Sequence, residues 1–220
     1  MREKGSLAAR AQVLWLAAMP ALFVLLWSTG FIGAKLGLPY AEPATFLTLR
    51  FAIVAGLLAI LALVTRAPWP QSWAEAGHVA VAGLLVHGVY LGGVFASIYR
   101  GVDAGVSALI VGTQPLLVAA VAGPVLGERV PRLTWLGLVL GFVGVTLVVW
   151  NKLGIGTGTL LGYALSVFAL FGISVGTVYQ KKYCAHADLR SANAVQFAAT
   201  AVVLLPFALG LHYAIVGLRH

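Results

Sequence analysis

The chain has 220 residues, of which 61% are hydrophobic and only 9% are charged, and its mean hydropathy is +0.98. A water-soluble domain of this length could not bury that much apolar surface, so lipid must cover most of it. The net charge of +8 does not indicate nucleic-acid binding, because the basic residues lie at the ends of apolar runs and not along one face. The single cysteine, Cys184, excludes a disulfide framework and a cysteine-based zinc site.

Residues 1–10 form a basic flank, and the apolar segment after them is too long for the core of a signal peptide, so we expect an uncleaved first span. Seven apolar runs then follow in chain order, at 13–38, 44–64, 74–98, 104–126, 133–150, 159–180 and 191–211. About 20 residues at a rise of about 1.5 Å each cross a bilayer core of roughly 30 Å. The runs lack the alternation of a membrane barrel. The sequence therefore predicts an all-α polytopic membrane protein with about seven transmembrane helices.

The fourth run contains a proline near its middle. Pro115 has no N–H, and its ring clashes with the carbonyl of Val111, so that carbonyl must find another partner. In lipid such a group is tolerated only where it faces protein or a water-filled cavity. Because many transporters build their pathway beside broken helices, Gln114-Pro115 predicts a helix break next to a pathway.

The distribution of lysine and arginine predicts the orientation of the chain. If the N-terminus is cytoplasmic, the inner flanks of the runs hold Arg2, Lys4, Arg10, Arg66, Arg129, Arg132, Lys181, Lys182 and Arg190. The outer flanks then hold only Arg100, Lys152 and Arg219. Since basic residues concentrate on the cytoplasmic side of membrane proteins, this bias predicts a cytoplasmic N-terminus.

The sixth and seventh runs repeat the first and second at an offset of 181 − 35 = 146 residues. The aligned pairs are Ser28 with Ser174, Gly30 with Gly176, Lys35 with Lys181, Arg50 with Gln196, and Phe51 with Phe197. The identity is weak, but the shared pattern Ser-x-Gly-x-x-x-x-Lys is unusual in membrane spans. Because the copies are offset by an odd number of helices, the second copy is inverted. Inverted repeats place a substrate site between the copies near mid-membrane.

A series of short motifs follows almost the whole chain. It comprises Trp27-Ser-Thr-Gly-Phe through Ala34-Lys35, Pro43-Ala-Thr-Phe, Leu49-Arg50-Phe51, Tyr99-Arg-Gly-Val-Asp-Ala-Gly, Gly112-Thr-Gln-Pro-Leu, Leu126-Gly-Glu-Arg-Val, Trp135-Leu-Gly and Gly141-Phe-Val-Gly-Val. In order and spacing these motifs resemble the EamA-type permeases of the drug/metabolite transporter superfamily. The resemblance implies two inverted repeats of five helices each, here a first repeat at 1–150 and an incomplete second repeat at 151–220.

The resemblance also implies a function. Such permeases carry small metabolites, amino acids or drugs, usually outward, by alternating access and without ATP. The expected partners are the lipid bilayer of a plasma membrane (the inner membrane of a bacterium) and a small-molecule substrate, with no nucleic acid and no cofactor. Because only seven runs are present, the last three helices of the second repeat would be missing, and we expect the chain alone not to transport. A homodimer in which two chains complete each other is an open alternative.

Polar and aromatic residues at membrane depth are candidates for the substrate pathway. The candidates are Trp27, Ser28, Lys35, Arg50, His87, Tyr90, Gln114, Pro115, Tyr163, Ser174 and Thr177. Lys35 and Arg50 could together attract an anion into the outer mouth. Alternatively, Lys35 snorkels to the surface, and Arg50 bonds to carbonyls or to an acidic residue such as Glu42 or Asp103. His87 could relay protons or bind substrate, or it could hydrogen-bond across helices in a purely structural role.

The sixth run carries a polar stripe. Tyr163, Ser166, Ser174 and Thr177 share one face at helical spacing, which predicts contact with a cavity or a neighbouring helix and not with lipid. The helix count leads to a different expectation for Tyr163, Ser174 and Gln196. An incomplete second copy would leave these polar side chains facing lipid, at a cost of several kcal/mol each.

Two other functions are open. One is a membrane protein that has lost transport and acts as an assembly partner. The other is an intramembrane serine hydrolase that uses His87 and the match of Gly172-Ile-Ser-Val-Gly176 to G-x-S-x-G. A nucleophile elbow needs a strand, a sharp turn and a helix, whereas this match lies inside an apolar run. There is no Walker loop and no His/Asp/Glu cluster with metal-ligand spacing, so we expect a protein that is not an enzyme and holds no metal.

Overall fold

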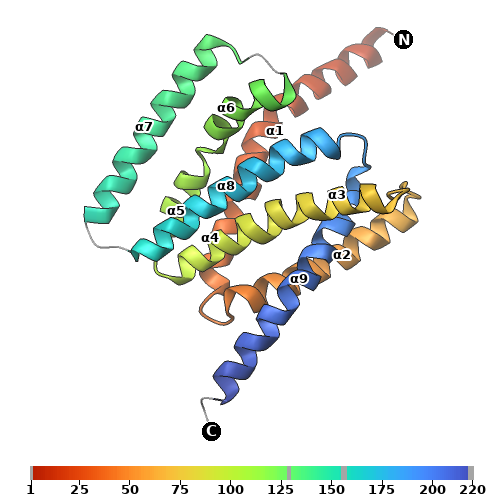
Figure 1. Cartoon of the computed structure of the whole chain (residues 1–220). Helices are drawn as coiled ribbons and strands as arrows, with labels where there is room; N and C mark the ends of the chain where they lie inside the picture. Colours follow the sequence, from red (N-terminus) through yellow and green to blue (C-terminus); the bar gives the residue numbers. More distant parts are fainter. Residues whose placement is uncertain (1, 128–129, 155–157, 218–220) are drawn as a thin grey trace.

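The computed structural model describes residues 2–127, 130–154 and 158–217, and every regular element in these ranges is a helix. The elements are α1 (Arg2–Gly37), α2 (Pro43–Val64), α3 (Trp73–Gly83), the π-helix η1 (Leu84–Val89), α4 (Tyr90–Tyr99), α5 (Ala104–Val111), α6 (Gln114–Leu126), α7 (Arg132–Gly154), α8 (Leu160–Tyr183) and α9 (Leu189–Gly217) (Figure 1). Within these ranges, seven helical segments are long and apolar enough to cross a membrane. The predicted all-α polytopic fold is confirmed.

The predicted runs coincide with these seven segments. Two of the segments are composite: Trp73–Tyr99 consists of α3, η1 and α4, and Ala104–Leu126 consists of α5 and α6. α7 and α8 continue past the ends of their predicted runs, to Gly154 and Tyr183 respectively. The charged turn between α6 and α7 begins at Gly127 in the left-handed conformation (φ 71°), which favours glycine and ends α6. Glu128 and Arg129 of this turn lie outside the described residues.

Polar residues in the turns cap several helices. Ser72 caps α3, Asp103 caps α5 and Thr159 caps α8, in each case with a side-chain oxygen that accepts a backbone N–H of the first turn, at 3.1, 2.8 and 3.1 Å. Each cap satisfies an N–H that has no partner within its own helix. The turn residues thus contribute to where these three spans begin.

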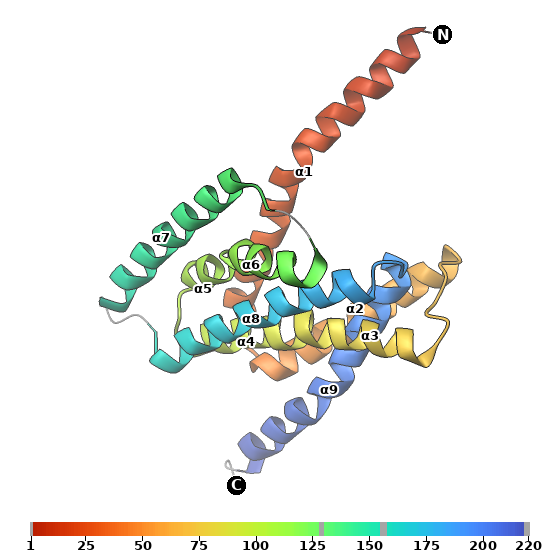
Figure 2. The same cartoon turned by 45° about the horizontal axis from the view of Figure 1, so that its top comes forward.

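Two extensive helix contacts form the centre of the bundle. α2 packs along α9, and α8 packs along the composite helix α3–η1–α4 (Figures 1 and 2). Small residues permit the second contact, because a Cβ added at Gly172 would lie 2.5 Å from Cγ1 of Val89, and one at Gly176 would lie 2.7 Å from Cγ2 of Val86. In lipid, helices associate through such close approaches and not through burial of apolar area alone. The last two spans are therefore packed into the bundle made by the first five.

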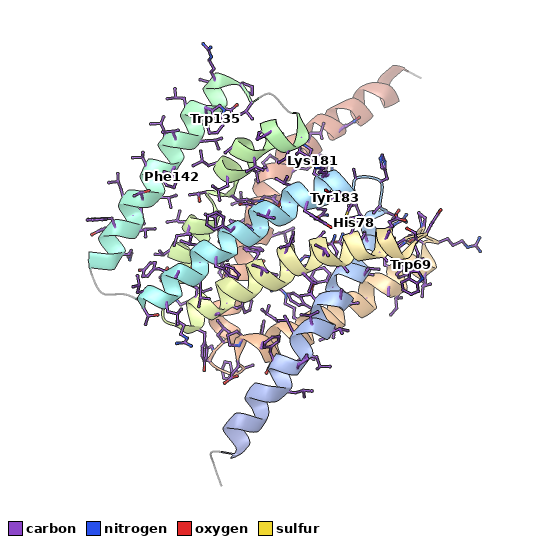
Figure 3. All side chains as sticks on the ribbon, viewed as in Figure 1. Trp69, His78, Trp135, Phe142, Lys181 and Tyr183 are labelled. Atoms are coloured by element: carbon purple, nitrogen blue, oxygen red, sulfur yellow. The ribbon has the colours of Figure 1, made fainter. Side chains whose placement is uncertain are left out.

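α7 lies at the edge of the bundle, where it packs mainly against α5 and α6 (Figure 1). None of the residues in its most apolar stretch is buried, and a Cβ added at Gly137 or Gly141 would meet open space. The side chains of Trp135 and Phe142 lie on this helix (Figure 3). The amino-terminal part of α1 and the carboxyl-terminal part of α9 also project from the bundle, toward opposite ends (Figure 2).

Candidate functional site

A cavity of about 550 Å³ lies among α1, α2, η1, α4, the junction of α5 and α6, α8 and α9. Its lining residues are Phe23, Leu26, Trp27, Gly30, Phe31, Arg50, Val86, His87, Tyr90, Leu91, Val94, Phe95, Val111, Gly112, Gln114, Pro115, Ile173 and Phe197. Several of these, such as Trp27, His87, Gln114 and Ile173, lie near the midpoint of their own membrane segment. The cavity is therefore at mid-membrane depth, and helices of both predicted copies form its wall.

The predicted pathway residues divide into three groups. Six of them line this central cavity: Trp27, Arg50, His87, Tyr90, Gln114 and Pro115. Ser28 and Lys35 line a second cavity, of about 470 Å³, together with Asp103 and again Trp27. Tyr163, Ser174 and Thr177 line neither of the two cavities and take part in helix packing instead. Trp27 and Phe31 border both cavities, which places α1 between them.

The π-helix η1 positions His87 against α9. His87 Nε2 is 3.2 Å from Oε1 of Gln196, and its ring stacks on Phe197 with ring centroids 4.0 Å apart and an angle of 20° between the planes. Since an amide oxygen only accepts, His87 donates this hydrogen bond through a protonated Nε2. A Cβ at Gly83 would lie 2.6 Å from the Cα of Gln196, so a glycine is needed for α9 to approach this closely.

The π-helical turn was not predicted from the sequence. π-turns are rare and often occur at functional sites, but the residues of Leu84–Val89 resemble any other apolar helical stretch. For Gln196, the partner of His87, the internal repeat gave one signal of a functional role, because it aligns Gln196 with Arg50. It did not indicate that Gln196 contacts His87.

The junction of α5 and α6 is a break in the fourth span, as predicted. α5 ends at Val111, α6 starts at Gln114, and the hydroxyl of Thr113 between them donates a 2.7 Å hydrogen bond to the carbonyl of Ile110. Pro115 supplies no N–H to the carbonyl of Val111, which is consistent with the interruption at this point. Val111, Gln114 and Pro115 all line the central cavity, so the break faces the cavity.

The polar stripe on α8 faces protein. The hydroxyl of Ser166 is hydrogen-bonded to those of Ser97 on α4 (2.7 Å) and Ser107 on α5 (2.9 Å), and the hydroxyl of Ser174 donates to the carbonyl of Leu170. Gln114 on α6 donates to Thr177, also on this stripe, at 2.9 Å. The prediction of a protein-facing stripe is confirmed.

The alternative expectation, that an incomplete second copy leaves Tyr163, Ser174 and Gln196 facing lipid, is wrong. Their exposed fractions are 6%, 6% and 1%. The reason is that α8 packs against the composite third span, α5 and α6, and α9 packs against α2 and α3. Tyr163 lies in an apolar cluster with Val102 and Val106.

The two intramembrane cations lie in different cavities. Arg50 lines the central cavity, whereas Lys35 lines the second cavity with Asp103. Within the described part of the chain, Arg50 forms no ion pair with Glu42 or Asp103, and Asp103 instead accepts the N–H of Gly105 at the start of α5. The predicted acidic partners of Arg50 are therefore not its partners in this structure.

Aromatic residues connect the start of α3 with the end of α8. His78 Nδ1 is hydrogen-bonded to the hydroxyl of Tyr179 at 2.7 Å, and the His78 ring stacks on Tyr183 at 4.8 Å between centroids (Figure 3). Sequence patterns did not single out this cluster, because its members are 101 residues apart along the chain. It holds together the ends of two spans, the composite third span and α8, that both border the central cavity farther along.

The hydrolase interpretation gains no geometric support. Ser174 lies within the continuous helix α8, and its hydroxyl donates to a carbonyl of the same helix, while Nε2 of His87 is engaged by Gln196. Among the described residues, no three His, Cys, Asp or Glu side chains come together as metal ligands would.

The amino-acid sequence also matches known proteins. A family model described as "EamA-like transporter family" matches residues 13–150. The chain is 30% identical over 169 residues to a Synechocystis protein named as an uncharacterized transporter, with 70% of this chain and 51% of the relative covered. It is 26% and 24% identical to proteins of Salmonella typhimurium and Escherichia coli that are each named "Probable amino-acid metabolite efflux pump". These two alignments cover 86% and 84% of this chain and 60% of each relative. The chain thus spans about half to three fifths of the length of these relatives.

Proposed function

The chain belongs to the EamA-like transporter family, and from this premise we propose that it carries small organic molecules across a membrane through the central cavity. The observation that carries the proposal is the cavity itself, about 550 Å³ at mid-membrane depth, with residues of α1, α2, α8 and α9 in its lining. A cavity of this size suits a small molecule. Inverted-repeat carriers hold their substrates in such a place.

The proposed mechanism is alternating access, driven by a gradient of substrate or protons. The predicted repeats pair α1–α2 with α8–α9, and rocking of one pair against the other would open the cavity to each side in turn. Two irregular elements lie in the wall, namely η1 and the break between α5 and α6. A helix can bend at an irregular turn while the regular turns on either side stay packed against their neighbours. The cavity wall can therefore change shape at η1 and at the α5–α6 break.

The proposal also includes the direction of transport and the orientation of the chain in the membrane. The names of the Salmonella and Escherichia relatives suggest efflux of amino-acid metabolites. The excess of lysine and arginine on the inner flanks supports a cytoplasmic N-terminus in a bacterial inner membrane. We assign 1–150 to the first repeat and 151–220 to the second.

A flux assay tests the proposal. The count of seven runs predicts no transport by the chain alone, but α8 and α9 are packed into the bundle and contribute Ile173 and Phe197 to the cavity wall. We therefore expect the purified chain, reconstituted in liposomes, to give saturable uptake of at least one radiolabelled compound from a panel of amino acids, organic acids and dyes. Gly30→Leu and Gly141→Leu form a matched pair, because a Cβ at either position meets open space but only Gly30 lines the cavity. Flux should fall with Gly30→Leu and stay unchanged with Gly141→Leu.

Equal effects of the two substitutions would contradict transport through this cavity. A correctly folded chain with no flux for any compound would instead favour the assembly-partner hypothesis.

A further inference from the structure

The charged lining of the central cavity is positive and lacks a negative counterpart in the part of the chain that the structure describes. Among the described residues that line the cavity, Arg50 is the only lysine, arginine, aspartate or glutamate. The carboxylates of the described side chains, Glu42, Glu75, Asp103 and Asp188, lie at or near the ends of the helices, outside this lining. A cationic group inside a membrane span with no acidic partner in its cavity is costly, and such residues commonly mark a substrate path.

Two other polar side chains of the cavity, His87 and Gln114, are already engaged with protein. His87 donates to Gln196, and the amide nitrogen of Gln114 donates to Thr177. Neither group supplies the negative charge that a positively charged ligand would need to offset its desolvation. An ammonium group that entered the cavity would also be repelled by Arg50.

The remaining wall favours an apolar body. On α1, Trp27 stacks with Phe23 at 6.3 Å and meets Phe31 edge-on at 5.1 Å between ring centroids, so three aromatic rings follow one another on the same helix. All three line the cavity. Aromatic faces contribute large apolar contact area and prefer offset or edge-on partners, which another ring can supply.

Resting on the proposed function, we propose a substrate class: small organic carboxylates with an apolar, preferably aromatic, body. The carboxylate pairs with the guanidinium of Arg50, which can donate two parallel hydrogen bonds to it. The body lies against the rings of α1. An ammonium group on the substrate is not required, since no acidic group in the described lining would receive it.

Ligand binding by the purified chain in detergent tests the charge preference without any need for transport. The probes share a phenyl ring and a short chain and differ in the head group: phenylpropionate (anion), phenylpropanol (neutral), phenethylamine (cation) and phenylalanine (zwitterion). Tryptophan fluorescence reports binding, because Trp27 lines the cavity. Phenylpropionate should bind about tenfold or more tightly than the alcohol, which is the usual effect of a charged hydrogen bond. Phenethylamine should bind most weakly, and phenylalanine no more tightly than phenylpropionate.

The proposal is overturned if the alcohol or the amine binds as tightly as the acid, if phenylalanine binds tenfold tighter than phenylpropionate, or if none of the four binds.

Variants locate the effect at Arg50. Arg50→Gln should abolish the preference for acid over alcohol, while Arg50→Lys should keep part of it. Arg132→Gln removes an exposed charge at the start of α7 and should change nothing. Retained binding of phenylpropanol shows that a variant is folded, and if Arg50→Gln does not fold, the wild-type series still decides. A preference for acid that persists in Arg50→Gln would overturn the assignment to this residue.

The same four probes in the liposome assay separate the two proposals. Selective binding without flux leaves the site intact and contradicts transport. Flux that shows no preference for the acid supports transport and contradicts the substrate class.

Discussion

The side-chain amide of Gln114 donates a 2.9 Å hydrogen bond to the hydroxyl of Thr177, which in turn donates a 2.7 Å hydrogen bond to the carbonyl of Ile173. This relay connects the first residue of α6, beside the helix break, to α8. Gln114 and Ile173 both line the central cavity. The break is thereby tied to α8, a neighbouring helix that also lines the cavity.

Thr177→Val tests this connection. Valine keeps the volume but removes the acceptor for Gln114, so the free energy of unfolding should fall by about 0.5–1.5 kcal/mol. Thermal unfolding in detergent measures the change. Thr146→Val is the matched control, because the hydroxyl of Thr146 donates only to Phe142 within α7, and it should cost less. A larger loss for the control would show that the relay does not couple the two helices.

Pro115→Ala tests the helix break. Alanine would supply the N–H that the carbonyl of Val111 lacks and would favour a continuous helix across Gly112 and Thr113. The variant should insert normally and show altered flux in liposomes. Pro124→Ala changes the other proline of α6, which does not line the central cavity, and should leave flux unchanged. Unchanged flux in Pro115→Ala, over the whole panel of compounds, would mean that the break only serves packing.

Glycines on α8 and α7 should differ sharply in their tolerance of a methyl group. Gly172→Ala places a Cβ 2.5 Å from Val89, a stiff β-branched side chain, and should destabilise the protein by about 1–3 kcal/mol. Gly141→Ala on α7 meets open space and should be neutral or slightly stabilising, since alanine favours a helix over glycine. Unfolding midpoints in detergent measure both. Equal midpoints would contradict the close contact between α8 and the third span.

His87 and Gln196 should behave as a pair. His87→Phe keeps an aromatic ring to stack on Phe197 but removes the donor, which leaves the amide of Gln196 buried without its hydrogen bond. A loss of about 1–3 kcal/mol in the free energy of unfolding is expected. Adding Gln196→Leu should recover part of that loss, because removal of both partners leaves no unsatisfied group. The double-mutant cycle measures the recovery, and additive losses would indicate that the two side chains do not interact.

Cys184 provides a natural test of orientation. It lies just beyond α8, and burial, followed by the nearby charge of Glu75, raises the pKa of its thiol. With a cytoplasmic N-terminus, a membrane-impermeant maleimide should label Cys184 in intact cells only after lysis. The variant Tyr40→Cys in a Cys184→Ser background carries a single cysteine between α1 and α2. This cysteine should be labelled from outside, because residue 40 is 90% exposed. Labelling of both from the same side would contradict the inverted arrangement of the two copies.

The same residue predicts a pH dependence. The thiolate is the reactive form, so a raised pKa leaves less of it at neutral pH. After lysis, Cys184 should react more slowly than the cysteine at position 40, and the difference should narrow as the buffer becomes more alkaline. A difference that does not change with pH would indicate that access, and not the pKa, limits the reaction.

The sequence by itself determined the number and position of the spans. Runs such as 44–64 are apolar over a length that only a membrane helix explains, and lipid imposes that length on every span alike. The break before Pro115 followed from the chemistry of one residue, which lacks an N–H wherever it is placed. The polar face of α8 followed from helical spacing, since Tyr163, Ser166, Ser174 and Thr177 recur at one side of a regular helix.

Only the tertiary structure decided which polar residues meet. Lipid is as apolar as a protein core, so hydropathy does not reveal which face of a span contacts a neighbouring helix. From the sequence, Tyr163, Ser174, Trp27 and Arg50 are all equally good pathway candidates. In the structure, Tyr163 and Ser174 serve packing, whereas Trp27 and Arg50 line the central cavity. The contact of His87 with Gln196 depends on a π-turn, a close approach at Gly83 and the packing of two spans that are 109 residues apart in the chain. Such a contact arises from the arrangement of whole helices, and no local pattern of residues encodes it.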